Sequence, residues 1–242
     1  MDRLTRRQLK QDEFRETFDR FEDYLKQHYQ DIITVILLAA AVVGLAAGLK
    51  YYVDRQEAAA NTELGAALKT FRAYVGTAAP GALGPDTETY ATAQTKYKKA
   101  LDQFNAIVQK YRMYPRPKAV AMARYHAGIC QALLGDQAAA IKTLQEAGLD
   151  RDREIAALAR FALADELAKA GKLPEAVKLY QELADHPTLT VPRATALLGM
   201  ADAYRASQPA RARQIYQQVD KEFGSDATVA EALRQQMTSL PQ

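Results

Sequence analysis

Apolar residues form one uninterrupted run near the start of the chain and then recur with helical spacing almost to its end. The run covers residues 32–49 and contains ten Ile, Val and Leu residues, five Ala and two Gly, with Thr34 as its single polar residue. As a helix with a rise of about 1.5 Å per residue it would span roughly 27 Å, close to the ~30 Å hydrocarbon core of a bilayer. The pattern therefore predicts a transmembrane helix, which we place at residues 32–53.

The flanks of the run agree with this prediction. Tyr29, Tyr51 and Tyr52 can lie at headgroup depth, and Lys50 can extend toward water. A buried core helix and a cleaved signal peptide are the alternative interpretations. A signal peptide has an apolar region of only about 7–15 residues close to the N-terminus. Here 31 residues precede the run, with seven Lys and Arg and eight Asp and Glu, so we favour an uncleaved anchor.

Small residues recur at a fixed interval after the anchor. Alanines stand 40, 36 and 36 residues apart, at Ala100, Ala140, Ala176 and Ala212. Four residues after each comes a large side chain, at Phe104, Leu144, Tyr180 and Tyr216. Gly135 and Gly171 precede two of these alanines by five residues, as expected for a tight turn between two helices. Such a period predicts helical hairpins stacked into a solenoid.

These residues resemble the tetratricopeptide repeat family. The likeness covers about residues 88–222 and is strongest over 119–147 and 155–183, where Gly128 occupies the expected small position. The turn before Ala212 has no glycine, and the aromatic at the front of each repeat is missing, because the chain has no Trp. The resemblance implies stacked hairpins that bind other proteins. A non-repetitive helical bundle is the alternative.

The predicted fold class is all-α, with a single N-terminal transmembrane helix followed by a solenoid of hairpins like tetratricopeptide repeats. The expected segments are a tail with an amphipathic juxtamembrane helix (1–31), the membrane helix (32–53), a membrane-proximal helix with a Gly- and Pro-rich loop (54–87), and a repeat domain with a C-terminal capping helix (88–242). We expect helices at 88–112, 117–134, 136–147, 153–170, 173–184, 191–206, 209–222 and 228–239, and a membrane helix that continues to about Tyr74.

Composition excludes several functional classes. The net charge is only +3, and Lys and Arg alternate with Asp and Glu, so a nucleic-acid partner is not indicated. The single cysteine, Cys130, cannot form an internal disulfide, and its apolar neighbours predict burial. The three histidines lie in separate segments without a second ligand at metal spacing. We therefore expect no enzymatic activity and no cofactor.

Three surfaces are candidates for contact with partners. By the geometry of the family, the first helix of each repeat lines a groove with Met122, Tyr125, Ile129, Leu158, Phe161, Leu197 and Tyr204, although several of these residues could instead belong to the core. The membrane helix has a strip of small residues that would let another helix approach closely, either from a partner or in a homo-oligomer. This strip comprises Ala40, Gly44 and Gly48. An apolar juxtamembrane stripe, suited to the inner leaflet or a partner helix, comprises Phe14, Phe18, Phe21 and Leu25.

The layout of tail, single span and repeats resembles the YfgM-type family, which are ancillary subunits of the bacterial SecYEG translocon. The closest local likeness is residues 21–56. The resemblance implies protein partners, namely translocon subunits, the membrane-anchored prolyl isomerase PpiD and periplasmic chaperones. Positive residues near the span are evenly divided, but the tail has seven in all, so we expect a cytoplasmic N-terminus and a periplasmic C-terminal domain at the bacterial inner membrane. The alternatives are a scaffold for a cell-envelope complex, in outer-membrane protein insertion or cell division, and, with reversed orientation, an anchored receptor.

Overall fold

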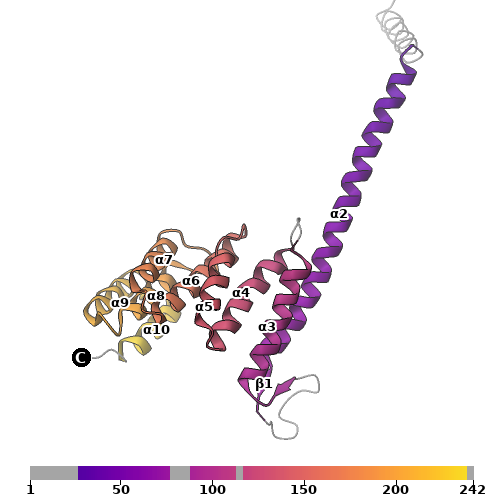
Figure 1. Ribbon diagram of the computed structural model, residues 1–242. Coiled ribbons are helices and arrows are strands. Elements are labelled where there is room, and N and C mark those ends of the chain that lie inside the picture. Colours follow the sequence, from indigo (N-terminus) through magenta and orange to yellow (C-terminus); the bar gives the residue numbers. More distant parts are fainter. Residues whose placement is uncertain (1–26, 77–87, 113–116, 239–242) are drawn as a thin grey trace, which may run out of the picture. The chain divides into compact units, whose positions relative to one another are not determined.

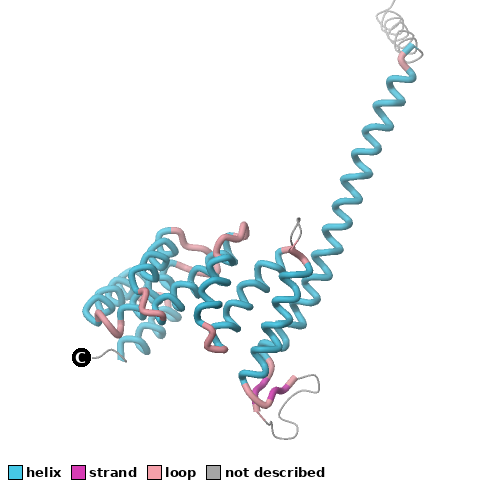
Figure 2. The backbone as a smooth tube through the Cα atoms, viewed as in Figure 1, coloured by secondary structure: helices cyan, strands magenta, loops and turns pink. Residues whose placement is uncertain are grey.

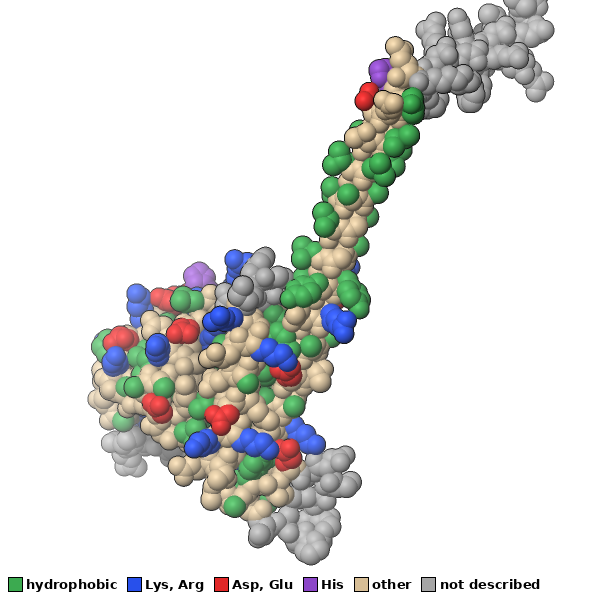
Figure 3. Space-filling view, turned by 45° about the vertical axis from the view of Figure 1, so that its right-hand side comes forward, with side chains coloured by type: hydrophobic (Ala, Val, Ile, Leu, Met, Phe, Trp, Pro, Cys, Tyr) green, Lys and Arg blue, Asp and Glu red, His purple; other side chains and the backbone are tan. Residues whose placement is uncertain are grey.

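The computed structural model describes residues 27–76, 88–112 and 117–238. The chain divides into two compact units, residues 1–55 and 56–242, which are described separately. Helix α2 (Tyr29–Arg72) begins in the first unit and contains an 18-residue window with a mean hydropathy of 2.7, none of it buried. Apolar side chains cover the face of α2 that is in view (Figure 3). A core helix of a soluble protein would be mostly buried, so α2 is a candidate membrane span.

The second unit is a series of antiparallel helices, each of which contacts the next (Figures 1 and 2). After α2 the helices are α3 (Ala93–Lys110), α4 (Lys118–Leu133), α5 (Gln137–Ala147), α6 (Arg153–Lys169), α7 (Leu173–Asp185), α8 (Arg193–Tyr204), α9 (Pro209–Phe223) and α10 (Ala227–Thr238). From α4 onward the bounds agree with the predicted helices to within two residues. The all-α fold class and the hairpin order are therefore confirmed.

A short parallel strand pair replaces the predicted start of the first helix. β1 (Tyr74–Val75) pairs with β2 (Thr89–Tyr90), with Tyr74 opposite Thr89. The Glu88 side chain accepts hydrogen bonds from the Thr70 and Tyr90 hydroxyls, which holds this segment in extended conformation beside the end of α2. Helix α3 begins only after Thr92, whose side chain accepts from the Thr95 backbone N–H. The prediction of a helix from residue 88 was wrong for this reason.

A glycine follows the C-terminal end of α4 and of α6, which are the first helices of the pairs α4–α5 and α6–α7. Gly135 and Gly171 have φ of 84° and 76°, the left-handed conformation that glycine adopts without a steric penalty. After each glycine the next residue donates its backbone N–H back into the helix, Asp136 to Gln131 and Lys172 to Leu167, both at 2.9 Å. These bonds complete the tight turns within the first two pairs, α4–α5 and α6–α7, as the glycine spacing predicted.

The predicted repeat forms the core. All four period-defining alanines are 0% exposed, and the large residues four positions later are at most 1% exposed. Ala60 and Ala67 of α2 are also fully buried and share one apolar cluster with α3 and α4. The compact unit therefore begins at Gln56 rather than at the predicted boundary of residue 88, because the second part of α2 packs as a helix of the stack.

A matched pair of glycine substitutions tests this packing. A Cβ added at Gly128 would lie 2.7 Å from Leu144 Cγ, whereas at Gly65 it would meet nothing within 4 Å. We expect Gly65→Ala to stabilise the protein by about 0.5–1 kcal/mol through helix propensity. Gly128→Ala should instead destabilise it, because overpacking costs about 1–3 kcal/mol. Thermal unfolding followed by circular dichroism in detergent measures both, and equal shifts would contradict the close contact of α4 with α5.

Candidate functional site

The first helices of the successive pairs lie next to one another. α4 contacts α6, and α6 contacts α8, in addition to the contacts of each helix with its neighbours in sequence. Equivalent side chains of these three helices therefore form a row across the stack. We call this row the inner face, and its members follow from the register between the pairs.

Two hydrogen bonds between a tyrosine and an aspartate fix that register. In the pair α6–α7 the Tyr180 hydroxyl donates to Asp165, and in the pair α8–α9 the Tyr216 hydroxyl donates to Asp202 Oδ1 at 2.6 Å. The two tyrosines are 36 residues apart, but the two aspartates are 37 apart. The connection from aspartate to tyrosine is thus one residue shorter in the last pair, and the side chains of α8 are displaced by one position from a constant period of 36.

This displacement corrects the predicted groove residues of α8. The geometry of the family predicted that Leu197 and Tyr204 line the groove, but their exposed fractions are only 2% and 9%, and both belong to the core. A period of 37 instead aligns Leu198 with Phe161, and Leu198 is half-buried. The inner face of α8 is therefore formed by Leu198 and Asp202.

The predicted groove residues of α4 and α6 are partly open. Met122, Tyr125, Ile129, Leu158 and Phe161 are all half-buried. The Phe161 ring packs edge-on against Tyr180, with centroids 5.5 Å apart, and the Tyr125 ring packs similarly against His126 at 4.9 Å. Such side chains are fixed by the core on one side and leave apolar surface on the other. Their contact with a partner remains a prediction.

Two carboxylates that were not predicted from the sequence, Asp165 and Asp202, accompany these apolar residues. Burial raises the pKa of Asp165, although the hydrogen bond from Tyr180 opposes this effect. Burial and then the charge of Asp165 raise the pKa of Tyr125. Asp202 also accepts a hydrogen bond from Gln236 Nε2 of α10 at 2.9 Å. The sequence offers one signal for Asp165 and Asp202, namely that they are 37 residues apart, one residue more than the alanine period of 36.

Each of these two carboxylates has a cation nearby. Lys169, whose charge acts on Asp165, donates to Glu166 at 2.6 Å. Arg205 lies 3.9 Å from Asp202, at the outer limit of an ion pair. The inner face consequently combines apolar surface on α4 and α6 with carboxylates on α6 and α8.

Comparison with known families agrees with this geometry. The tetratricopeptide repeat family matches residues 122–148 and 195–225, which are the pairs α4–α5 and α8–α9. No curated protein matches the chain significantly. These two pairs are similar to tetratricopeptide repeats. We refer below to the pairs α4–α5, α6–α7 and α8–α9 as the first, second and third tetratricopeptide-like repeat (TPR).

Arginines replace the aromatic residue of the TPR pattern. That pattern has Trp four residues before its small residue, and Arg124 and Arg160 stand there in the first and second TPR. An open cavity of about 790 Å³ lies beside Arg124, and one of about 560 Å³ lies beside Arg160. Arg160 Nε donates to the Gly148 carbonyl at 2.9 Å. In the third TPR the position is taken by Leu197, which explains its burial.

Two residues with potential for catalysis or metal binding, His126 and Cys130, pack in or against the core. His126 Nδ1 lies 2.9 Å from the Met122 carbonyl oxygen, its ring packs against Phe71 and Phe104, and burial lowers its pKa. Cys130 is buried as predicted, and burial raises its pKa to about 12. Within the described parts of the chain, no three His, Cys, Asp or Glu residues are grouped as metal ligands would be.

The other two predicted surfaces lie at or before the membrane helix. Ala40, Gly44 and Gly48 are exposed on α2, and a Cβ added at either glycine would meet nothing within 4 Å. This strip is therefore available to another helix, and its use remains a prediction. Phe14, Phe18, Phe21 and Leu25 lie outside the described residues.

The buried carboxylate predicts a pH-dependent effect on stability. Because the pKa of Asp165 is raised above its ordinary value of 3.8, its contribution to the free energy of unfolding is fully present below that pH and is lost as the pH rises through the raised pKa. Asp165→Asn removes this loss. As the pH rises from 3.5 to 7, the free energy of unfolding of the variant should therefore increase relative to that of the wild type. Urea unfolding at both pH values measures the change.

Glu222→Gln is the control of opposite sign. Hydrogen bonds from Gln218 and Arg193 lower the pKa of Glu222, so its contribution is present above its ordinary value of 4.5 and is lost as the pH falls. This variant should lose stability relative to wild type as the pH rises. The same trend in both variants would contradict the assignment of Asp165.

Proposed function

We propose that this protein is a single-pass, membrane-anchored TPR protein that binds segments of other proteins on its inner face. The observation that carries the proposal is that helix α2 contains an exposed apolar segment and continues into the TPR stack. The 18-residue window of α2 is 0% buried, although it is apolar enough to span a bilayer. The run contains nine exposed Ile, Val and Leu residues. They favour insertion into lipid by a few kcal/mol, at roughly 0.3–0.6 kcal/mol each.

The inner face supports a role in protein binding rather than in a reaction. TPRs are protein-interaction modules, and Tyr125, Leu158, Phe161 and Leu198 provide rigid, partly exposed apolar side chains on three adjacent helices. Apolar grooves of this kind take up amphipathic helices or extended segments through a few anchor residues. His126 and Cys130 are engaged in core packing, which supports a non-enzymatic role.

We place the TPRs on the periplasmic side of a bacterial inner membrane. Seven Lys and Arg in residues 1–31 favour retention of the short tail in the cytoplasm. A single buried cysteine suits an oxidising compartment. The likeness in layout to the YfgM-type family supports an accessory role at the Sec translocon, in which secreted chains would be received on the inner face and passed to periplasmic chaperones.

Photocrosslinking tests the inner face. A photoreactive amino acid at position 125 or 158 should form adducts with other polypeptides in cells, because both side chains face the proposed partner. Lys178, which is exposed on the second helix α7, provides the matched control and should form few adducts. Adducts of equal yield at all three positions would contradict a binding role for the inner face. The identity of the adducts tests the translocon and chaperone assignment.

Substitution of the small-residue strip tests the membrane contact. Gly44→Ile together with Gly48→Ile should leave membrane insertion intact, because isoleucine is at least as favourable in lipid as glycine. The bulky side chains should prevent close approach of a second helix and so reduce recovery of the complex on native gels. Unchanged migration would refute a packing role. Loss of SecY from the complex would support the translocon, whereas loss of only a second copy of this chain would support a homo-oligomer.

A further inference from the structure

One edge of the repeat unit is joined by a continuous series of polar contacts. The Lys118 backbone N–H donates to Glu57 Oε2 at 3.1 Å, which connects α4 to α2. The Lys118 ammonium lies 3.8 Å from Asp152 at the start of α6. Glu154 then accepts from the Thr190 backbone N–H at 2.9 Å. We call this the inter-repeat edge, because it consists of the connections between TPRs at residues 148–152 and 186–192 and the helix starts beside them.

Each of these two connections holds a leucine out in solvent. Leu149 is 77% exposed and Leu189 is 91% exposed, the highest values among large apolar side chains in the described parts of the chain. The neighbouring backbone is fixed, since Asp152 N–H donates to Asp150 Oδ1 at 3.0 Å and Thr190 is bound by Glu154. A single exposed leucine is ordinary. Two at corresponding places on one edge require a common explanation, because neither contributes to the core.

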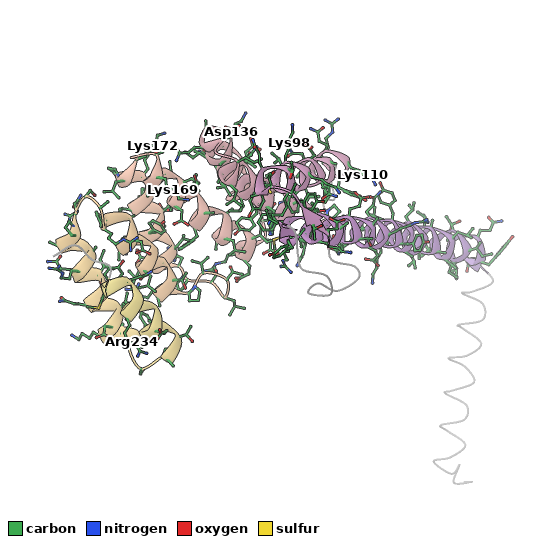
Figure 4. The ribbon with its side chains drawn as sticks, turned by 90° about the horizontal axis from the view of Figure 1, so that it is seen from below. Lys98, Lys110, Asp136, Lys169, Lys172 and Arg234 are labelled. Carbon is green, nitrogen blue, oxygen red and sulfur yellow. The ribbon has the colours of Figure 1, made fainter. Side chains whose placement is uncertain are left out.

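The opposite edge differs in character. It is formed by the turns within each TPR, which present exposed charged residues such as Asp136 and Lys172 on one side of the unit (Figure 4). Leu133, at the end of α4, is the exposed leucine of that edge, at 51%. The most exposed apolar side chains of the repeats thus belong to the inter-repeat edge.

The inter-repeat edge begins close to the predicted membrane span. Glu57 follows Leu49, the last residue of the apolar run, by eight residues within the continuous helix α2, which is about 12 Å of helix. The headgroup layer alone is roughly 5–8 Å thick on each side of the hydrocarbon core. With residues 32–49 spanning a bilayer as proposed, this length of chain limits the distance of Glu57 from the hydrocarbon boundary to about 12 Å.

The charges on the edge favour lipid headgroups over a protein partner. The cavity beside Leu149 is lined by equal numbers of cations and carboxylates, namely Lys118, Arg124, Arg151 and Arg153 against Glu146, Asp150, Asp152 and Glu154. Protein interfaces have an apolar centre and a polar rim. Here charged side chains, among them Arg151, Arg153 and Glu182, line the cavity between the two leucine-bearing connections together with Ala156, Ala157 and Leu183. Two separate leucine side chains, with charged residues of both signs between them, suit the headgroup region of a bilayer.

We propose that the inter-repeat edge rests on the bilayer surface, with Leu149 and Leu189 inserted among the headgroups. This inference rests on the proposed membrane anchor. Two leucines alone would bind a free protein to lipid only weakly, but the anchor makes their insertion an intramolecular event at high effective concentration. Because the charges balance, the contact needs no anionic lipid and persists at high salt.

Tryptophan fluorescence tests the contact, since the natural chain has no Trp and each variant reports one position. The full-length variants Leu149→Trp, Leu189→Trp, Val42→Trp and Leu133→Trp are reconstituted into phosphatidylcholine vesicles, with and without bromine on the acyl chains. V42W should lose most of its emission in brominated lipid, and L149W and L189W should also lose emission. L133W, on the opposite edge, should keep its emission.

Each other result overturns a defined part of the proposal. If V42W is quenched while L149W or L189W keeps its emission, the anchor stands and the edge contact is refuted. Equal quenching of L133W with the two edge variants also refutes a contact specific to this edge. If V42W itself keeps its emission, the membrane anchor fails and the inference fails with it.

Discussion

The contact between a buried alanine and the neighbouring helix is the constraint on which the stack depends. Ala100, Ala140, Ala176 and Ala212 have no exposed surface, and one turn later each second helix inserts a single large side chain between its neighbours. Interiors of this density tolerate neither a cavity nor an added carbon atom without cost. The alternation of small and large residues therefore sets both the distance between helices and the period of the chain.

This constraint explains why the sequence predicted so much of the fold. Alanine and large residues on the second helices keep a 36-residue period in the last three pairs, so helix order and most helix ends followed from it. The register of α8 did not follow, because the connection from Asp202 to Tyr216 is one residue shorter than its counterpart. A period read from second helices cannot detect this difference, so the sequence predicted that Leu197, which lies in the core, would line the groove.

The candidate site was predicted less completely than the fold. Its apolar members on α4 and α6 could be placed by helical spacing, but Asp165 and Asp202 could not. A carboxylate on a half-buried face is explained only by its partner, here a tyrosine 14 or 15 residues away on the next helix. Likewise, the absence of the aromatic residue at the front of each repeat was evident from the sequence. The cavities beside Arg124 and Arg160 were not, because each is formed by two helices and a connection that pack together.

The ends of the stack connect membrane attachment to folding. A solenoid must cover the apolar face of its terminal units. At the C-terminal end α10 does so, through buried Leu233 and the hydrogen bond from Gln236 to Asp202. At the other end Ala60 and Ala67 of α2 are buried in one apolar cluster with Phe104 and Ile107 of α3. Because α2 also contains the candidate span, the helix that would enter the bilayer is the same helix that closes the core, so the repeats cannot be separated from it at residue 88 without exposing that face.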